Sequence, residues 1–213
     1  MKKLAILGSG DLGQLIAHHA VNDHQYEVVG FFDDYQEIGS MIMNVPVIGK
    51  FNQVNSLFVS GKFDCLMMGV GYKHMAARKS LFESLRSNIP FGNLIHSSSY
   101  VDPSAELGDG VFILPGCTVD KHVKIGNNVL LNVAAVVAHD TQIDSHTFLG
   151  PSASIAGKTH IEECCFIGIN STVIDNIHIK NNITIAGGAV VTKNLTESGL
   201  YAGIPAKHIK HSI

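Results

Sequence analysis

A repeat with a period of six residues runs from Val101 to Thr196 and constrains the fold of this chain more than any other feature. Its fifth position is usually small or β-branched, as at Ala105, Cys117 and Thr141. Its second position is often glycine, as at Gly108 and Gly126. Its first position is always aliphatic: Val101, Leu107, Ile113, Val119, Ile125, Leu131, Val137, Ile143, Leu149, Ile155, Ile161, Ile167, Val173, Ile179, Ile185 and Val191.

A period of six does not fit an α-helix, whose apolar positions recur every three to four residues. It fits a parallel β-solenoid, in which each hexad is one short strand plus a corner and three hexads form a triangular coil. We expect the aliphatic residue to point into the prism, the small residue to sit near the corner, and Gly, Asn and Asp to take the strained turn dihedrals. The alternative, a β-sandwich with chance alternation, would not keep this register through so many repeats.

The first hundred residues predict a small parallel α/β domain. An apolar run over residues 2–7 leads into a GxGxxG pattern, a helix is expected over 11–21, and a second strand over 26–32 ends at an acidic pair. The glycines let the backbone approach a phosphate, and the helix N-terminus offers N–H groups to an anion. The predicted substrate-binding residues are therefore Gly8, Ser9, Gly10, Asp11, Leu12, Gly13, Asp33 and Asp34.

A further strand over 64–70, a helix over 73–87 and a strand over 91–95 are expected to complete a small doubly wound sheet. We place a Rossmann-like domain, expected to bind a nucleotide, at residues 1–96 and a β-helix domain with a C-terminal tail at 97–213. The alternative for the first domain is that the glycines only permit tight strand–helix packing.

The whole chain resembles the sialic acid O-acetyltransferase type of hexapeptide-repeat enzyme, and among these the nucleotide-linked amino-sugar N-acetyltransferases. The resemblance rests on seven segments: residues 8–13, 32–34, 93–96, 138–140, 168–171, 187–189 and 203–207. It implies a left-handed β-helix, acetyl-CoA as co-substrate, and acetylation of the 4-amino group of a nucleotide-linked 4-amino-4,6-dideoxy sugar for bacterial surface glycans. O-acetylation of a sugar hydroxyl, as in sialic acid modification, is the alternative.

Some positions depart from the pattern of this family. Relatives have His where this chain has Leu12, and Asn in the region of Gly71 and Tyr72. Both positions are expected near the nucleotide or sugar, so Gly71 and Tyr72 join the predicted substrate-binding residues. A second solenoid histidine of the family aligns with Phe148.

His139 is the predicted general base, because an imidazole titrates near neutrality and can take a proton from an attacking amine. Asp140 is predicted to hold the imidazole, although adjacent strand residues point to opposite faces and the pair can meet only at a bend. We interpret His122, His160 and His178 as surface histidines.

The late coils are predicted to hold the acyl donor. Residues 185–189 carry almost no side-chain bulk, which leaves room for a pantetheine arm, and nearby lysines are placed to meet phosphates. The alternatives are corner geometry for the glycines and a solvated tail for the lysines. A backbone N–H near Gly157 is expected to stabilise the developing oxyanion. The predicted acetyl-CoA-binding residues are Gly157, Gly168, Ala186, Gly187, Gly188, Lys193, Ile204, Pro205 and Lys207.

Composition excludes several other classes of function. The net charge of −3 gives no argument for nucleic acid or an anionic membrane, and no apolar run is long enough to span a bilayer. The histidines show no metal-site spacing, so no metal is expected. The four cysteines read as core residues in a reduced compartment, and with no signal peptide apparent we expect a cytoplasmic protein. A non-catalytic nucleotide-binding solenoid and an NAD-dependent oxidoreductase stay as alternatives from other classes.

A homotrimer with active sites between subunits is the expected assembly. Apolar residues outside the first and fifth hexad positions imply a partner surface, and a repeated heterologous contact on a three-sided prism closes most simply as a ring of three. The residues concerned are Leu114, Leu130, Val133, Val136, Phe148, Phe166 and Ile169.

Overall fold

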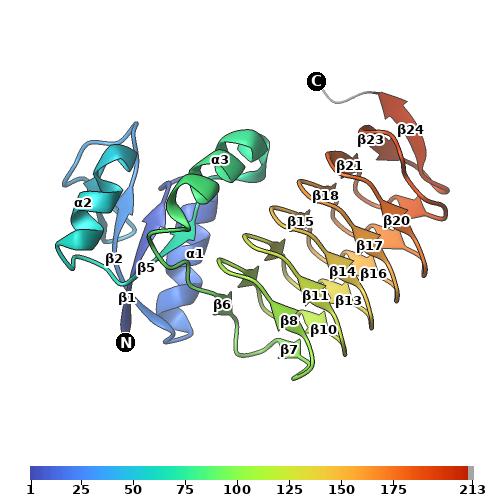
Figure 1. The fold of residues 1–213 in the computed structure, drawn as a ribbon, viewed down its shortest axis with the longest axis horizontal. Coiled ribbons are helices and arrows are strands. Elements are labelled where there is room, and N and C mark those ends of the chain that lie inside the picture. Colours follow the sequence, from blue (N-terminus) through green and yellow to red (C-terminus); the bar gives the residue numbers. More distant parts are fainter. Residues whose placement is uncertain (211–213) are drawn as a thin grey trace. The chain divides into compact units, whose positions relative to one another are not determined.

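In a computed structural model of the chain, which describes residues 1–210, the polypeptide forms two compact units, Met1–Leu94 and Ile95–Ile213 (Figure 1). Residues 211–213, the end of the predicted tail, lie outside the described part. The sequence-based boundary after residue 96 differs from this division by two residues. Each unit is described by itself.

The N-terminal unit is a five-stranded sheet in the order β3-β4-β2-β1-β5, parallel except for the β3–β4 hairpin. Its strands are β1 (Lys2–Leu7), β2 (Tyr26–Phe32), β3 (Met41–Ile42), β4 (Val45–Gly49) and β5 (Cys65–Met68). Its helices are α1 (Asp11–Asn22), α2 (Val54–Val59) and α3 (Met75–Leu85), with 3₁₀ turns η1 (Phe51–Gln53) and η2 (Tyr72–His74). The first two predicted strands and the first helix are confirmed to within one residue.

Two features of this unit differ from the sequence-based expectation. Strands β3 and β4 and helix α2 were not predicted. The strand expected over 91–95 is wrong as part of this sheet: Phe91 makes a single bridge to Leu66, and β6 (Leu94–Ile95) extends a solenoid sheet beside β9. Just beyond this bridge, the Asn93 carbonyl accepts a hydrogen bond from the Tyr26 hydroxyl (2.8 Å).

The solenoid has three parallel faces, each named here by one of its early strands. The β7 face contains β7 (Tyr100–Val101), β10 (Thr118–Val119), β13 (Val136–Val137), β16 (Ser154–Ile155), β19 (Thr172–Val173) and β22 (Val190–Val191). The β8 face contains β8 (Glu106–Leu107), β11 (Lys124–Ile125), β14 (Gln142–Ile143), β17 (His160–Ile161) and β20 (His178–Ile179). The β9 face contains β6, β9 (Phe112–Ile113), β12 (Leu130–Leu131), β15 (Phe148–Leu149), β18 (Phe166–Ile167), β21 (Ile183–Ile185), β23 (Gly199–Ala202) and β24 (Lys207–Lys210). Only β24 runs antiparallel.

The register confirms the hexad interpretation. Paired residues lie eighteen apart, as for Thr118 and Val136, so three hexads make one coil. First-position residues from Ile113 to Val191 are buried in one continuous core, and fifth-position residues join them. Where the fifth residue is threonine, its hydroxyl donates to a backbone carbonyl, as Thr141 does to Ala156 (3.1 Å), which satisfies a polar group inside the prism.

The backbone at the corners differs from the expectation that the second-position glycines take the strained turn dihedrals. The left-handed backbone falls on the fourth hexad position, at every sixth residue from Gly110 to Gly188, and residues such as Ala134 adopt it. The second-position glycines do not have positive φ. A β-carbon on Gly126 would come 2.6 Å from the backbone nitrogen of Ser145 in the next coil, so these glycines permit close coil stacking.

Candidate active site

The His139–Asp140 pair lies at the corner between β13 and β14, where the β7 face turns into the β8 face. Asp140 occupies the left-handed position (φ 59°), and this bend brings its Oδ2 to 2.9 Å from Nδ1 of His139. The hydrogen bond from His139 lowers the pKa of Asp140, and the nearby His122 and Lys121 side chains act in the same direction. The carboxylate is therefore ionised and close enough to orient the imidazole.

Gly157 stands directly beside this imidazole, one coil further along. A β-carbon there would come within 2.7 Å of Cε1 and Nε2 of His139. Gly157 is buried, and its N–H donates to no acceptor among the described residues. A buried N–H without a partner is uncommon and costly, so this one is available for an oxygen that binds beside His139.

The glycines predicted for the acyl donor lie on the other edge of the β7 face. Gly168 and residues 186–188 form corners between the β9 and β7 faces, so this edge and the His139 edge flank one face. Gly168 and Gly187 also serve coil stacking: a β-carbon would lie 2.6 Å from the Gly187 nitrogen in the first case and 2.8 Å from Cγ2 of Ile169 in the second. Gly188 adopts positive φ (68°). The geometry of the corners therefore accounts for glycine at all three positions, whether or not these residues also bind the acyl donor as predicted.

The C-terminal segment covers the last coil. The Ala206 N–H donates to the Val190 carbonyl (2.7 Å) and the Val190 N–H to the Gly203 carbonyl (3.1 Å). This places Ile204 and Pro205, both exposed, beside the final strand of the β7 face. Lys193 and Lys207 are exposed as well.

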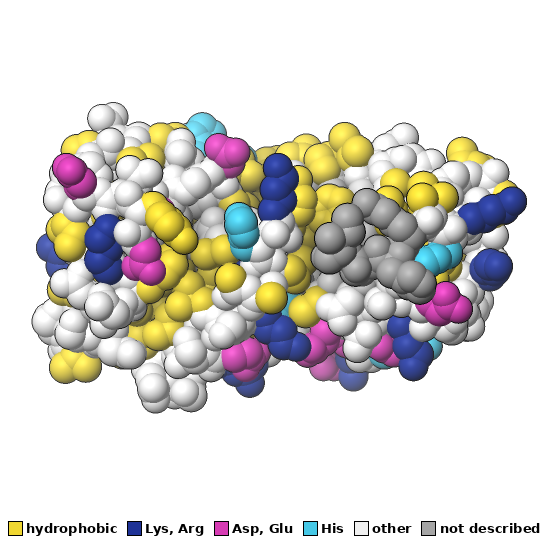
Figure 2. Space-filling model, turned by 90° about the horizontal axis from the view of Figure 1, so that it is seen from above, with side chains coloured by type: hydrophobic (Ala, Val, Ile, Leu, Met, Phe, Trp, Pro, Cys, Tyr) yellow, Lys and Arg dark blue, Asp and Glu magenta, His cyan; other side chains and the backbone are white. Residues whose placement is uncertain are grey.

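The β7 face between these edges is lined by small or apolar outward residues, including Val136, Ser154, Thr172 and Val190. Large exposed apolar side chains gather on it and its two flanking corners: Tyr100 (55% exposed), Val133 (44%), Val136 (39%), Ile169 (57%) and Ile174 (37%). Figure 2 shows hydrophobic side chains along one edge of the solenoid and charged ones along the other. Leu114 and Leu130, expected in the same patch, are buried within the chain, and Phe148 and Phe166 are half-buried and stacked 5.2 Å apart on the β9 face.

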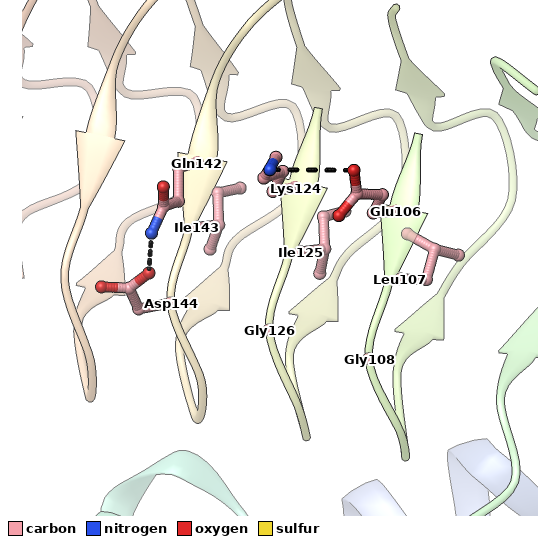
Figure 3. Close-up of a pocket in the computed structure, with 9 residues that line it drawn as sticks. All are labelled: Glu106, Leu107, Gly108, Lys124, Ile125, Gly126, Gln142, Ile143 and Asp144. Atoms are coloured by element: carbon pink, nitrogen blue, oxygen red, sulfur yellow. Dashed lines mark hydrogen bonds and ion pairs between the residues drawn. The ribbon is translucent and has the colours of Figure 1, made fainter. Parts of the chain in front are cut away.

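The β8 face is polar. Its shallow hollow of about 320 Å³ is lined by β8, β11 and β14, with Lys124 Nζ 3.7 Å from Glu106 Oε1 and Gln142 donating to Asp144 (2.7 Å) (Figure 3). Further along, the rings of His160 and His178 stack 5.0 Å apart, and each ring bonds a carboxylate. None of the predicted site residues lines this hollow.

In the N-terminal unit, the glycine-rich loop packs against the loop that follows β5. A β-carbon on Gly69 would come 2.6 Å from the Gly8 carbonyl oxygen and 2.8 Å from the Gly13 α-carbon. Helix α1 begins at Asp11, and its N-cap residue Gly10 makes no side-chain capping bond. The first N–H groups of α1 therefore point out of the loop toward any anion bound there.

Asp33 is tied to this loop rather than open to solvent. Its Oδ2 accepts bonds from the Ser9 N–H (2.9 Å) and the Ser9 hydroxyl (2.6 Å), and Oδ1 accepts from the Tyr35 N–H (2.9 Å). Burial by itself would raise the pKa of Asp33, but the bonds from Ser9, Tyr35 and the Gln36 backbone outweigh it and lower that pKa. Asp34 is exposed, and its Oδ1 accepts from the Phe51 N–H (2.9 Å).

A cavity of about 480 Å³ opens beside the loop, and its wall is mostly apolar. Such a volume is typical of small-molecule sites. It is lined by Gly8, Asp33, Tyr35, Phe51, Val70, His74, Ala77, Ser80, Leu81 and Ser84. Gly71 and Tyr72 precede α3 next to this wall, with Tyr72 42% exposed. Sequence reasoning missed most of these residues; the helical spacing of His74, Ala77 and Leu81 was the available signal, whereas nothing pointed to Phe51.

No helix in the described part of the chain is long and apolar enough to cross a membrane. Within residues 1–210, no group of three or more His, Cys, Asp or Glu side chains is arranged to hold a metal ion.

Two family models match the chain. The GMPPB C-terminal domain matches residues 91–198, just over half of the chain, and the PglD N-terminal domain matches residues 3–85. No curated protein sequence matches significantly.

Solved structures match over nearly the full length. The acetyltransferase domain of PglB from Neisseria gonorrhoeae FA1090, in complex with acetyl coenzyme A, is 29% identical with a TM-score of 0.89, covering 98% of this chain and 99% of that one. A His-to-Ala mutant of the GDP-perosamine N-acetyltransferase from Caulobacter crescentus, in complex with CoA and GDP-perosamine, is 27% identical with a TM-score of 0.90, covering 97% and 96%. WeeI from Acinetobacter baumannii AYE, 21% identical with a TM-score of 0.84 over 97% and 99%, shares the fold.

The repeat register, the His139–Asp140 corner and these matches agree with the resemblance read from the sequence. The chain belongs, over residues 91–198, to the family of the GMPPB C-terminal domain, and over nearly its full length its structure is similar to those of hexapeptide-repeat amino-sugar N-acetyltransferases.

Proposed function

We propose that this protein transfers the acetyl group of acetyl-CoA to the 4-amino group of a nucleotide-linked 4-amino-4,6-dideoxy sugar, a reaction of bacterial surface glycan synthesis. The observation that carries this proposal is the His139–Asp140 bond at a corner packed on Gly157, which supplies a base and a free N–H side by side. The likeness to enzymes whose structures hold CoA and GDP-perosamine extends over both units and supports the same chemistry.

In this reaction acetyl-CoA supplies an activated thioester carbonyl. His139 accepts the proton that the amine loses as it attacks that carbonyl, and Asp140 holds the ring and stabilises its protonated form. The buried N–H of Gly157 donates to the carbonyl oxygen as negative charge develops on it. A base and an oxyanion donor within one coil of each other meet the geometric need of acyl transfer.

The two units divide the substrates. Residues 8–13, Asp34, Gly71 and Tyr72, with the adjacent cavity, bind the nucleotide sugar. The glycine edge of the β7 face and the residues Ile204, Pro205, Lys193 and Lys207 bind the acyl donor along the solenoid. The β-helix is left-handed, as in the family. All four cysteines are free thiols, in keeping with a reducing cytoplasmic location.

A homotrimer completes the active site in this proposal. The β7 face carries both the catalytic edge and the large exposed apolar side chains, which a monomer would leave in water. Covering this face with a neighbouring subunit would place His139 beside the partner and close the acyl-donor groove. When each subunit makes the same contact with the next, three subunits close into a ring.

Thiol release from acetyl-CoA tests the proposal. We expect turnover with nucleotide-linked 4-amino sugars from a panel of UDP-, dTDP- and GDP-linked compounds, and a fall in kcat of roughly 10²–10⁴-fold for His139→Ala with the fold intact. His122→Ala, one coil earlier at an exposed corner, serves as the matched control. Turnover with free sialic acid alone would support O-acetylation, and unchanged kcat in His139→Ala would contradict a catalytic solenoid.

A further inference from the structure

The acidic residue after β2 is commonly read as a direct ligand of a bound nucleotide, in which its carboxylate accepts a ribose hydroxyl. In this protein most of the acceptor sites of that carboxylate are already used. The Asp33 carboxylate accepts bonds from the Ser9 N–H, the Ser9 hydroxyl and the Tyr35 N–H. A carboxylate offers roughly four acceptor sites, so little capacity is left for a ligand.

Both members of the Ser9–Asp33 pair are buried, with Ser9 3% and Asp33 9% exposed. The pair lies 24 residues apart in sequence and joins the glycine-rich loop to the end of β2. The same loop is held from two further directions: the Gly8 N–H donates to the Phe32 carbonyl (2.8 Å), and Gln14 Nε2 donates to the Ser9 carbonyl (3.0 Å).

These contacts fix the peptide groups that precede α1. The Ser9 N–H is turned inward onto Asp33, and its carbonyl is turned onto Gln14, so the chain enters α1 with one defined orientation. The next N–H groups, at the helix start, are then directed outward together. An anion-binding loop depends on such a preset orientation, because its donors otherwise pay an ordering cost when the ligand binds.

We propose that Asp33 is a positioning residue that presets the glycine-rich loop for the diphosphate through Ser9, and that it does not bind the ribose. The assignment rests on the proposed nucleotide-sugar substrate and concerns how the N-terminal unit holds it. Asp34, exposed and with one oxygen bonded only to Phe51, is the member of the acidic pair that faces solvent.

Binding of UDP, GDP and dTDP, followed by calorimetry, tests this, with the 2′,3′-dideoxy analogue of the tightest of the three as the second ligand. We expect Ser9→Ala and Asp33→Asn each to weaken binding roughly tenfold, the scale of one lost charged hydrogen bond. The losses should be equal for the ribose and dideoxy ligands, and the KM for acetyl-CoA should not change. The double variant should be little weaker than either single variant, because both act on one contact.

Asp34→Asn is the matched control for charge, because it removes the same charge one residue away. Any loss of binding free energy that it causes should add to the loss caused by Ser9→Ala when the two substitutions are combined. If Asp33 instead bound the ribose, the Asp33→Asn loss would disappear with the dideoxy ligand, and Ser9→Ala, by freeing the carboxylate, would leave binding unchanged or tighter. Either result overturns the assignment. If Asp33→Asn does not fold, Ser9→Ala alone decides: weaker binding supports the positioning role, and unchanged or tighter binding contradicts it. Failure of the wild-type protein to bind any nucleotide would overturn the proposed function itself.

Discussion

The imidazole of His139 lies against the α-carbon of Gly157, so closely that a β-carbon on Gly157 would come within 2.7 Å of both Cε1 and Nε2 of the ring. Successive coils are spaced by the strand separation of a parallel sheet, about 4.8 Å, which leaves no room for a side chain between them at this point. The position of the His139 imidazole therefore depends on the absence of a side chain at residue 157.

Gly157→Ala should displace the ring of His139 and lower kcat at least roughly tenfold, since a small misplacement of a catalytic group is costly. Gly157 does not adopt positive φ, so alanine causes little backbone strain and the melting temperature should change little. Lys158→Ala, at the next position of the same corner, should keep kcat near the wild-type value. Wild-type kcat in Gly157→Ala would show that the ring is not held there.

The pH dependence of the free energy of unfolding should show that the ionised Asp33 carboxylate stabilises the fold. Its pKa is lower in the folded protein than the unfolded value of about 3.9. Its contribution is therefore fully present above pH 3.9 and is lost as the pH falls through the lower, folded pKa. Urea unfolding of the wild type and Asp33→Asn should give a constant difference in free energy from pH 7 to about 4 and a shrinking difference below it. A difference that does not depend on pH would contradict an ionised, hydrogen-bonded Asp33.

The cysteines should differ in reactivity. Burial raises the pKa of Cys65 and Cys117 to about 11 and that of Cys165 to about 12, so these thiols are protonated and covered at neutral pH. Cys164 is partly exposed at a corner. Titration of the native protein with a disulfide reagent at pH 8 should modify Cys164 first, and Cys164→Ser should remove the fast phase. Modification of a second thiol at the same rate would argue against the buried placement.

Ile169→Asp should break the proposed trimer, because it puts a charge on the exposed apolar part of the β7 face. Sedimentation should change from about 69 kDa, three times 22.9 kDa, to the monomer mass, and activity should fall in parallel. Ile209→Asp, equally exposed but on β24, is the control and should stay trimeric. A wild-type monomer with full activity would overturn the assembly.

The sequence was most informative where one residue type recurs at one structural position. The first-position aliphatics, from Ile113 to Val191, determine three faces and a core because each is repeated by its neighbour eighteen residues away. The corners were harder to predict. Gly126 was assigned to turn dihedrals, yet its role is to admit the backbone of the next coil, a relation between residues that a single hexad does not contain.

Irregular parts of the chain gave weaker signals. Strand β4 contains Pro46 and ends at Gly49, and the following helix α2 has only six residues. Neither segment is therefore regular enough to show a clear hydrophobic period. At the candidate active site, residue type and sequence context singled out His139 and Asp140, but the contact between His139 and Gly157 depends on coil stacking. Leu114 and Leu130 look outward-facing by position and are nonetheless buried, which the repeat alone does not reveal.

The eighteen-residue register also restricts how the length of such a chain can change in evolution. Inserting or deleting one hexad before His139 would advance every later corner by a third of a turn and move the histidine to a different face of the prism. Only whole coils can be gained or lost ahead of His139 without turning its corner, and the later coils with it, relative to the coils that precede it. Homologues of this protein should therefore differ in solenoid length by multiples of eighteen residues, and engineered insertions or deletions should also comprise whole coils of eighteen residues.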